Sequence, residues 1–179
     1  MEPFVAKTIS IIKRMKLPRN ILELEITEHA IMQDMDKAID TLGRLTDKGV
    51  RIAIDDFGTG YSSLGYLQTL PINTLKMDRS FVQGIKAKGD NSIIDAIIAM
   101  AKGLNLDLIA EGVENEAQVE HLTQAGCYLA QGFFYAPPMP EEELLQRFKS
   151  AQQDITAAEP TTASKQPDAG SDDNLPPAL

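Results

Sequence analysis

The chain alternates between short apolar runs and longer segments in which apolar residues recur every three or four positions. Apolar residues at helical spacing predict amphipathic helices, whereas short runs of apolar or alternating residues predict strands. The predicted strands cover residues 21–26, 50–54, 71–75, 106–110 and 126–130. The predicted helices cover residues 4–16, 36–48, 91–102, 115–126 and 140–148. Strands that alternate with helices indicate a parallel sheet joined by crossover helices.

Residues at the ends of two predicted helices support this assignment. Asp90 is the predicted N-cap of the helix at 91–102, and Gly103 follows as its stop. Asn115 and Gln118 have the spacing of a capping box, in which each residue satisfies a backbone amide of the other. We therefore expect helices to begin at both places.

Each predicted strand runs into a polar residue at or just beyond its carboxyl end. These residues are Glu25, Asp55, Lys76, Glu111 and Gln131. In a barrel of parallel strands the carboxyl ends meet at one rim, where catalytic groups gather. Five strands that deliver polar groups to one rim predict a functional site there more strongly than any single residue does.

The predicted fold class is α/β, a (β/α) barrel of the TIM type with about five βα units. A closed eight-stranded barrel typically needs about 250 residues, so we expect a barrel that is incomplete at its N-terminal end. An open parallel edge favours pairing with another chain or segment. Residues 151–179 contain several prolines and no apolar period, so we predict a domain at 1–150 and a disordered tail at 151–179.

The stretch 51–64 concentrates the candidate chemistry. A strand-like run ends in the adjacent carboxylates Asp55 and Asp56, and a loop with Gly58 and Gly60 follows. Two carboxylates at the end of a buried strand are costly to desolvate unless a cation meets them, and hard divalent cations take carboxylate oxygens. The alternative is that Asp56 caps a turn or helix and Asp55 pairs with a lysine. The dipeptide alone leaves both interpretations open.

Composition narrows the functional classes. The net charge of −9 argues against non-specific binding to nucleic acid or anionic membranes, but it permits a small phosphorylated ligand held through metal ions. Cys127 is the only cysteine, which excludes a disulfide framework and a cysteine zinc cluster. The first residues lack the pattern of a signal peptide, and no apolar run reaches membrane-spanning length. We therefore expect a cytoplasmic location.

Five short segments of the chain resemble the EAL-domain phosphodiesterases of cyclic di-GMP. The segments are 25–28, 55–64, 76–78, 111–114 and 131–133. They follow the order and spacing of the family over about residues 4–148. The family fold is a TIM-like barrel, which agrees with the alternation of strands and helices. The resemblance implies metal-dependent hydrolysis of cyclic di-GMP to linear pGpG.

The resemblance also implies roles for the polar residues at the strand ends. Glu25, Asp55 and Asp56 would be ligands of two Mg²⁺ or Mn²⁺ ions, with Asp55 bridging them. Lys76 would orient the attacking water and stabilise charge on the phosphoryl group, and Glu111 would be the general base.

Five further residues would support this site by resemblance. Asp78, Glu114 and Gln131 would contact the substrate or the residues around the metals. Glu28 would anchor the glycine-rich loop, with Ser62 as its partner.

The chain departs from the family at its front. The Glu-Ala-Leu signature of the family lies upstream of these segments, and no Glu-x-Leu-x-Arg pattern occurs near the front of this chain. The upstream metal-binding asparagine is also missing, because Asn20 precedes its strand. We therefore expect an incomplete two-metal site with reduced or no activity alone. The alternative is a non-catalytic module that binds cyclic di-GMP or a protein, as a homodimer or with a missing N-terminal segment.

Overall fold

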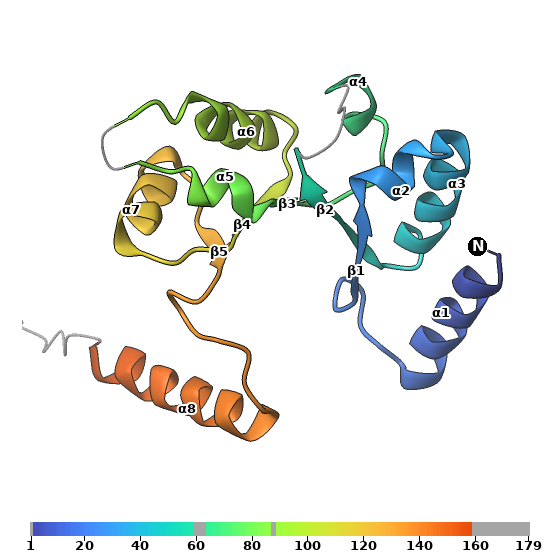
Figure 1. Ribbon diagram of the computed structural model, residues 1–179. Coiled ribbons are helices and arrows are strands. Elements are labelled where there is room, and N and C mark those ends of the chain that lie inside the picture. Colours follow the sequence, from blue (N-terminus) through green and yellow to red (C-terminus); the bar gives the residue numbers. More distant parts are fainter. Residues whose placement is uncertain (1, 59–63, 87–88, 159–179) are drawn as a thin grey trace, which may run out of the picture. The chain divides into compact units, whose positions relative to one another are not determined.

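The computed structural model describes residues 2–58, 64–86 and 89–158. The chain divides after Pro137 into two compact units. The first unit contains a sheet with helices around it, and the second contains the helix α8 (Figure 1).

The first unit is built on a parallel sheet of five strands, which confirms the predicted α/β alternation. Neighbours in the sheet follow sequence order, as in a (β/α) barrel. The strands are β1 (Glu23–Thr27), β2 (Arg51–Phe57), β3 (Thr74–Met77), β4 (Asp107–Glu111) and β5 (Leu129–Gln131). Within the described part of the chain, β1 and β5 each pair with one neighbour only, so the sheet has two end strands.

Seven helices accompany this sheet in the described residues of the first unit. They are α1 (Glu2–Met15), α2 (Glu28–Met32), α3 (Met35–Thr46), α4 (Leu64–Leu67), α5 (Arg79–Gln83), α6 (Ser92–Gly103) and α7 (Glu116–Ala125). The sequence predicted α1, α3, α6 and α7. It missed α2, α4 and α5, because helices of four or five residues are too short to show a helical period.

The helix ends agree with the sequence in one case and differ in another. The predicted capping box of α7 is present, since the Asn115 side chain accepts from the Gln118 amide and the Gln118 side chain accepts from the Asn115 amide. In α6, however, the N-cap is Asn91 rather than Asp90. Asp90 instead accepts from the Ser92 backbone amide, which is a local turn just before the helix.

The core surrounds the middle of β2. Ile52, Ala53 and Ile54 are all fully buried. Successive side chains of a strand point to opposite faces, so this strand is covered on both sides. Burial on both faces is typical of parallel sheets, and it leaves polar side chains room only at the strand ends.

One arginine ties together the amino ends of four strands. Arg51 contacts Glu23 at 3.0 Å, Thr74 at 3.1 Å and Asp107 at 2.6 Å, and each of these residues begins its own strand. The Glu23 hydrogen bond outweighs partial burial, so the pKa of the Arg51 guanidinium lies above its usual value. These contacts hold the four strands together at the end of the sheet opposite to the candidate site.

The helix of the second unit is longer than the sequence predicts. The helix α8 (Glu141–Ala158) continues past the predicted end at Phe148 and past the predicted start of the tail at residue 151. The extension is rich in Ala and Gln, which favour helix without an apolar period. The division after Pro137 likewise precedes the predicted domain end at residue 150. The remainder of the predicted tail, 159–179, lies outside the described residues.

No helix in the described parts of the chain is both long enough and apolar enough to cross a membrane.

Candidate functional site

The ammonium group of Lys76 is the centre of the site. Lys76 lies on β3, and its side chain is only 8% exposed. Its Nζ lies 2.8 Å from Glu25 Oε2, 2.9 Å from Asp55 Oδ1 and 2.9 Å from Glu111 Oε1. The three carboxylates come from β1, β2 and β4. The structure therefore brings together four of the five polar residues that the sequence placed at strand ends.

The charge state of Lys76 follows from this environment. Burial alone lowers the pKa of an ammonium group, but the polar contacts with Glu111, Glu25 and Asp55 outweigh it. The pKa of Lys76 consequently lies above its usual value, and the group is cationic at neutral pH. It offsets part of the repulsion among the three carboxylates.

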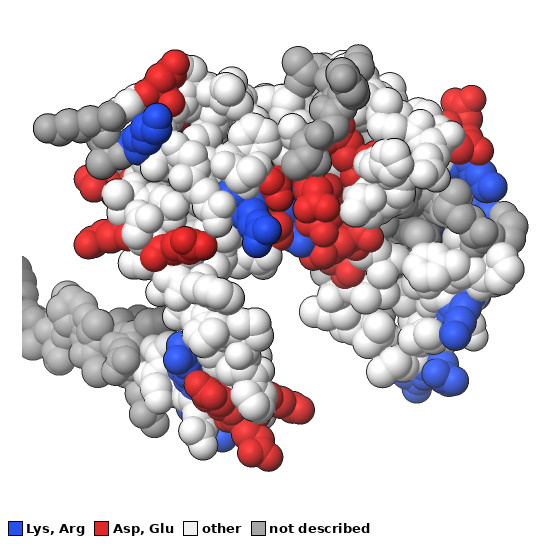
Figure 2. Space-filling model, in the orientation of Figure 1, with Lys and Arg blue, Asp and Glu red and all other residues white. Residues whose placement is uncertain are grey.

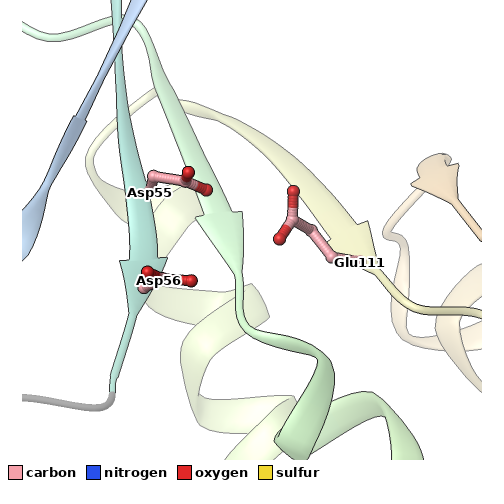
Figure 3. A group of neighbouring side chains, drawn as sticks. All are labelled: Asp55, Asp56 and Glu111. Carbon is pink, nitrogen blue, oxygen red and sulfur yellow. The ribbon is translucent and has the colours of Figure 1, made fainter.

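An irregularity in β2 turns two adjacent carboxylates toward one place. The register between β2 and β3 shifts between Ile54 and Phe57, and Asp56 has a left-handed backbone with φ of 55°. In a regular strand Asp55 and Asp56 would point to opposite faces. Here, carboxylate oxygens of Asp55, Asp56 and Glu111 all lie within 4.8 Å of one another (Figure 3). A left-handed non-glycine residue is strained, and such strain is common at functional sites.

This group of carboxylates fits a divalent cation. Asp55 Oδ1 is buried and has the Lys76 ammonium nearby, yet among the described residues no donor reaches it with hydrogen-bond geometry. A buried carboxylate oxygen with unused acceptor capacity is suited to a metal ion. Three carboxylates suit Mg²⁺ or Mn²⁺, which prefer oxygen ligands.

The grouping differs in one member from the predicted ligand set. The sequence predicted Glu25, Asp55 and Asp56 as ligands, whereas the three oxygens close enough to share an ion belong to Asp55, Asp56 and Glu111. Glu25 instead contacts Lys76. The difference arises because Glu25 pairs in register with Ala53, two positions before Asp55, and so lies lower on the sheet.

The fifth strand-end residue orients Glu111. The amide of Gln131, the last residue of β5, donates to Glu111 Oε1 at 2.7 Å. Lys76 and Gln131 thus both contact the same oxygen of Glu111, Oε1. Its side chain is 16% exposed, which leaves it accessible to a ligand.

Two predicted site residues are engaged with α5 rather than with Lys76. Asp78 caps α5 through the Ser80 backbone amide at 3.0 Å. The Ser80 hydroxyl also donates to Asp78, and this hydrogen bond lowers the pKa of the Asp78 carboxyl. Glu114 Oε1 accepts from the Gln83 amide at 3.3 Å. Both acids flank the rim at the loops that follow β3 and β4.

Glu28 connects α2 to the segment that follows β2. It is 3% exposed, and it accepts from the Gly58 amide at 3.2 Å and from the Tyr66 hydroxyl at 3.3 Å. Its predicted partner Ser62 lies outside the described residues. Sequence reasoning missed Tyr66 and Gln83, because neither forms part of a local motif.

The acidic residues dominate the surface of this rim. Figure 2 shows acidic side chains gathered in the middle of the drawn face, with basic side chains next to them. A parallel α/β sheet with acids and a lysine at the carboxyl ends of its strands is typical of the (β/α) barrel class, in which functional groups gather at that rim.

The family can be stated from sequence comparison. The sequence model of the EAL domain matches residues 1–138, and the chain belongs to this family. Solved EAL domains, which are TIM-like barrels, share its fold. The EAL domain of Mycobacterium smegmatis DcpA is 43% identical, with a TM-score of 0.76 over 82% of this chain and 66% of that chain. A PaMucR phosphodiesterase in complex with c-di-GMP is 46% identical, with a TM-score of 0.74 over 78% of this chain and 63% of that chain.

Two similar proteins come from Pseudomonas aeruginosa. The bifunctional diguanylate cyclase/cyclic di-GMP phosphodiesterase MucR is 49% identical over 133 residues, which are 74% of this chain and 19% of MucR. The cyclic di-GMP phosphodiesterase NbdA is 48% identical over 132 residues, which are 72% of this chain and 17% of NbdA. The chain thus spans about a fifth of the length of the curated relatives it matches.

Proposed function

We propose that this chain carries part of a metal-dependent site that hydrolyses cyclic di-GMP to linear pGpG. Family membership supports the proposal, since relatives at 48–49% identity are named as cyclic di-GMP phosphodiesterases. The observation that carries it is the Lys76 ammonium, which contacts carboxylates from three different strands at the carboxyl end of the sheet.

In this proposal Asp55 and Asp56 hold a Mg²⁺ or Mn²⁺ ion, and Glu25 supplies a further carboxylate. The buried Asp55 Oδ1 and the approach of Asp55 and Asp56 oxygens within 4.8 Å support the first two ligands. Glu25 is included because its carboxylate contacts the same Lys76 ammonium, at 2.8 Å. When bound, the ion would supply Lewis-acid polarisation of the phosphodiester and would acidify water.

The residues of the chain then have separate tasks. Glu111, held by the Gln131 amide at 2.7 Å, accepts the proton of the attacking water. Lys76 donates hydrogen bonds to the phosphoryl oxygens, where negative charge develops. Asp78 and Glu114 border the space in which the rest of the dinucleotide lies.

The described segment alone is proposed to have reduced or no activity. A closed barrel of this class has eight strands, and the described residues provide five, with β1 and β5 as end strands. Geometry matters at such a site, because a displacement of about 1 Å can reduce the rate about 100-fold. Of the three carboxylates that contact Lys76, Glu25 on the end strand β1 is the most exposed, at 51%.

The test is to incubate the chain with cyclic di-GMP and Mg²⁺ or Mn²⁺ and to measure pGpG by chromatography. We expect EDTA to abolish turnover and Glu111→Gln to reduce it by about 10²- to 10⁴-fold. The matched control is Glu120→Gln, which removes an exposed acid on α7 whose carboxylate accepts from the Gln124 side chain at 3.1 Å. Equal effects of the two substitutions would contradict the proposal.

A second candidate is a module that binds cyclic di-GMP without hydrolysing it. The open sheet favours it, because an incomplete rim can keep ligand contacts while losing catalytic geometry. Calorimetric titration with cyclic di-GMP in the presence of Mg²⁺ separates the two. Binding without pGpG indicates the module, and a chain that neither binds nor hydrolyses the dinucleotide excludes both.

A further inference from the structure

The side chain of Gln118 is buried and makes three hydrogen bonds to backbone groups. Gln118 lies on α7 and is 3% exposed. Its Oε1 accepts from the backbone amides of Glu114 at 2.7 Å and Asn115 at 3.1 Å. Its Nε2 donates to the Val82 carbonyl of α5 at 3.1 Å. A capping box needs only the Asn115 contact, so the contacts to Glu114 and Val82 exceed what helix capping requires.

The segment that Gln118 holds begins directly after Glu111. This segment, 112–115, is also fixed to the end of β5. The Val113 amide donates to the Gln131 carbonyl at 3.1 Å, and the Val113 carbonyl accepts from the Phe134 amide at 2.9 Å. A Cβ atom on Gly132 would lie 2.1 Å from the Val113 carbonyl oxygen, so the two backbones are in direct contact.

The same segment lies against α5 on its other side. Gly112 has a φ of 71°, and a Cβ atom there would lie 2.6 Å from the Cβ of Arg79, the first residue of α5. The helix α5 follows Lys76 after only Met77 and Asp78. The Gln118–Val82 hydrogen bond therefore links the backbone after Glu111 to the helix after Lys76.

We propose that Gln118 is a positioning residue, which locks the segment 112–115 to α5 and thereby sets Glu111 against Lys76 and the carboxylates of Asp55 and Asp56. The effect of Gln118 on metal binding rests on the proposed function, whereas its effect on the segment 112–115 does not. The hydrogen bonds of the Gln118 side chain go to backbone groups of Glu114, Asn115 and Val82, so it acts through the backbone on both sides of the rim.

The test compares Gln118→Met with Asn115→Ala. The first variant keeps the length and burial of the side chain but removes all three of its hydrogen bonds. The second removes the other half of the capping box, the bond from the Gln118 backbone amide to Asn115 Oδ1 at 3.1 Å. Both weaken the start of α7, but only the first cuts the connection to Val82 and Glu114.

The readouts are the dissociation constant for Mn²⁺ alone and hydrogen exchange at the amides of residues 113–115, both at a temperature where each variant is folded. We expect Gln118→Met to weaken Mn²⁺ binding by about tenfold or more, the range seen when support of a metal site is lost. We also expect it to speed exchange at Glu114 and Val113. Asn115→Ala should leave Mn²⁺ binding within about twofold of the unsubstituted chain.

If both variants lose the same Mn²⁺ affinity, Gln118 only caps α7, and the proposal is wrong. If Gln118→Met binds Mn²⁺ as tightly as the unsubstituted chain, Gln118 does not position the site, and the proposal is also wrong. If the unsubstituted chain does not bind Mn²⁺, the proposed function fails. Hydrogen exchange is measured without metal, so it tests separately whether Gln118 holds the segment 112–115. If the Glu114 amide exchanges at the same rate in both variants, Gln118 does not hold this segment.

Discussion

Asp56 combines a candidate ligand with an unfavourable backbone. Its φ of 55° is costly for any side chain that has a Cβ, by about 1–2 kcal/mol for most residues. Glycine pays no such penalty. The irregularity in β2 is thus held in place by the surrounding sheet, and it brings carboxylate oxygens of two neighbouring aspartates within 4.8 Å of each other.

Two substitutions separate strain from chemistry at this position. Asp56→Gly and Asp56→Ala both remove the carboxylate, so both should weaken Mn²⁺ binding equally. Because only Ala is strained at positive φ, we expect Asp56→Ala to be less stable than Asp56→Gly by about 1 kcal/mol in urea denaturation. If Asp56→Ala were the more stable variant, the backbone at this position would have left the left-handed conformation in the variants.

Lys76 gives a prediction with a defined pH dependence. Lys76→Met leaves three carboxylates without their shared cation, and we expect a loss of about 3 kcal/mol in the free energy of unfolding at neutral pH. The folded pKa of Lys76 lies above its unfolded value of 10.5. The contribution of its charge is therefore complete below pH 10.5 and declines as the pH rises through the higher folded value.

The measurement is denaturant unfolding of both proteins across this pH range, with Lys48→Met as the control at an exposed lysine. The stability gap at Lys76 should narrow only in strongly alkaline solution. A gap that already closes near neutral pH would contradict the raised pKa.

At the scale of elements, the contact between the end of β5 and the loop after β4 is a close approach of two backbones. Gly132→Ala would place a Cβ 2.1 Å from the Val113 carbonyl oxygen and 2.2 Å from its nitrogen. Neither atom belongs to a flexible side chain, so we expect destabilisation of about 3 kcal/mol, at the upper end for overpacking.

Gly43→Ala is the matched control, because a Cβ at Gly43 in α3 meets no atom within 4 Å. Alanine favours helix interiors over glycine by about 1 kcal/mol, so this variant should be slightly more stable than the unsubstituted chain. Chemical denaturation of the two variants measures the change in the free energy of unfolding, which should fall for Gly132→Ala and rise for Gly43→Ala. A neutral Gly132→Ala would mean that the loop can move away from β5.

The helices and strands that could be predicted from the sequence are those long enough to show a regular apolar spacing. All five strands and the longer helices follow from apolar spacing, and the capping box fixes the start of α7. Strand ends were placed too early, because β2 continues through Asp55 and Asp56 to Phe57 despite their charge. The network of Arg51 was missed, since residues at the starts of separate strands meet only once the register is known.

The sequence predicted which residues lie at the site, but it did not predict which of their side chains contact one another. Spacing and resemblance brought out Lys76 and its three acidic partners. Only the structure shows that Glu25 contacts the lysine while Glu111 joins the two aspartates. Side-chain contacts of this kind depend on differences of a few ångströms in strand register, which periodicity does not encode.

At the scale of the whole molecule, metal binding should be visible as stability. A ligand at 100 times its dissociation constant adds about 2.7 kcal/mol to a folded state that alone binds it. For a chain of this size we expect Mn²⁺ to raise Tm by roughly 5–11 °C. Scanning calorimetry of the chain and of Asp55→Asn checks this, because the variant should show little increase.

The two end strands give a second expectation at this scale. β1 and β5 each leave one side without a partner strand in the described residues, and such edges favour association. We expect the elution volume on a sizing column to decrease as the protein concentration rises. A constant monomer position over a hundredfold range would show that neither edge pairs with another copy.

An ammonium enclosed by acidic groups is a resident counter-ion. It keeps the carboxylates from driving one another apart before any metal arrives, so the rim is assembled in advance. The same charge repels an incoming divalent cation and lowers its affinity. Occupancy of the site should consequently follow the free concentration of metal in the surroundings, rather than remain saturated by ions retained from folding.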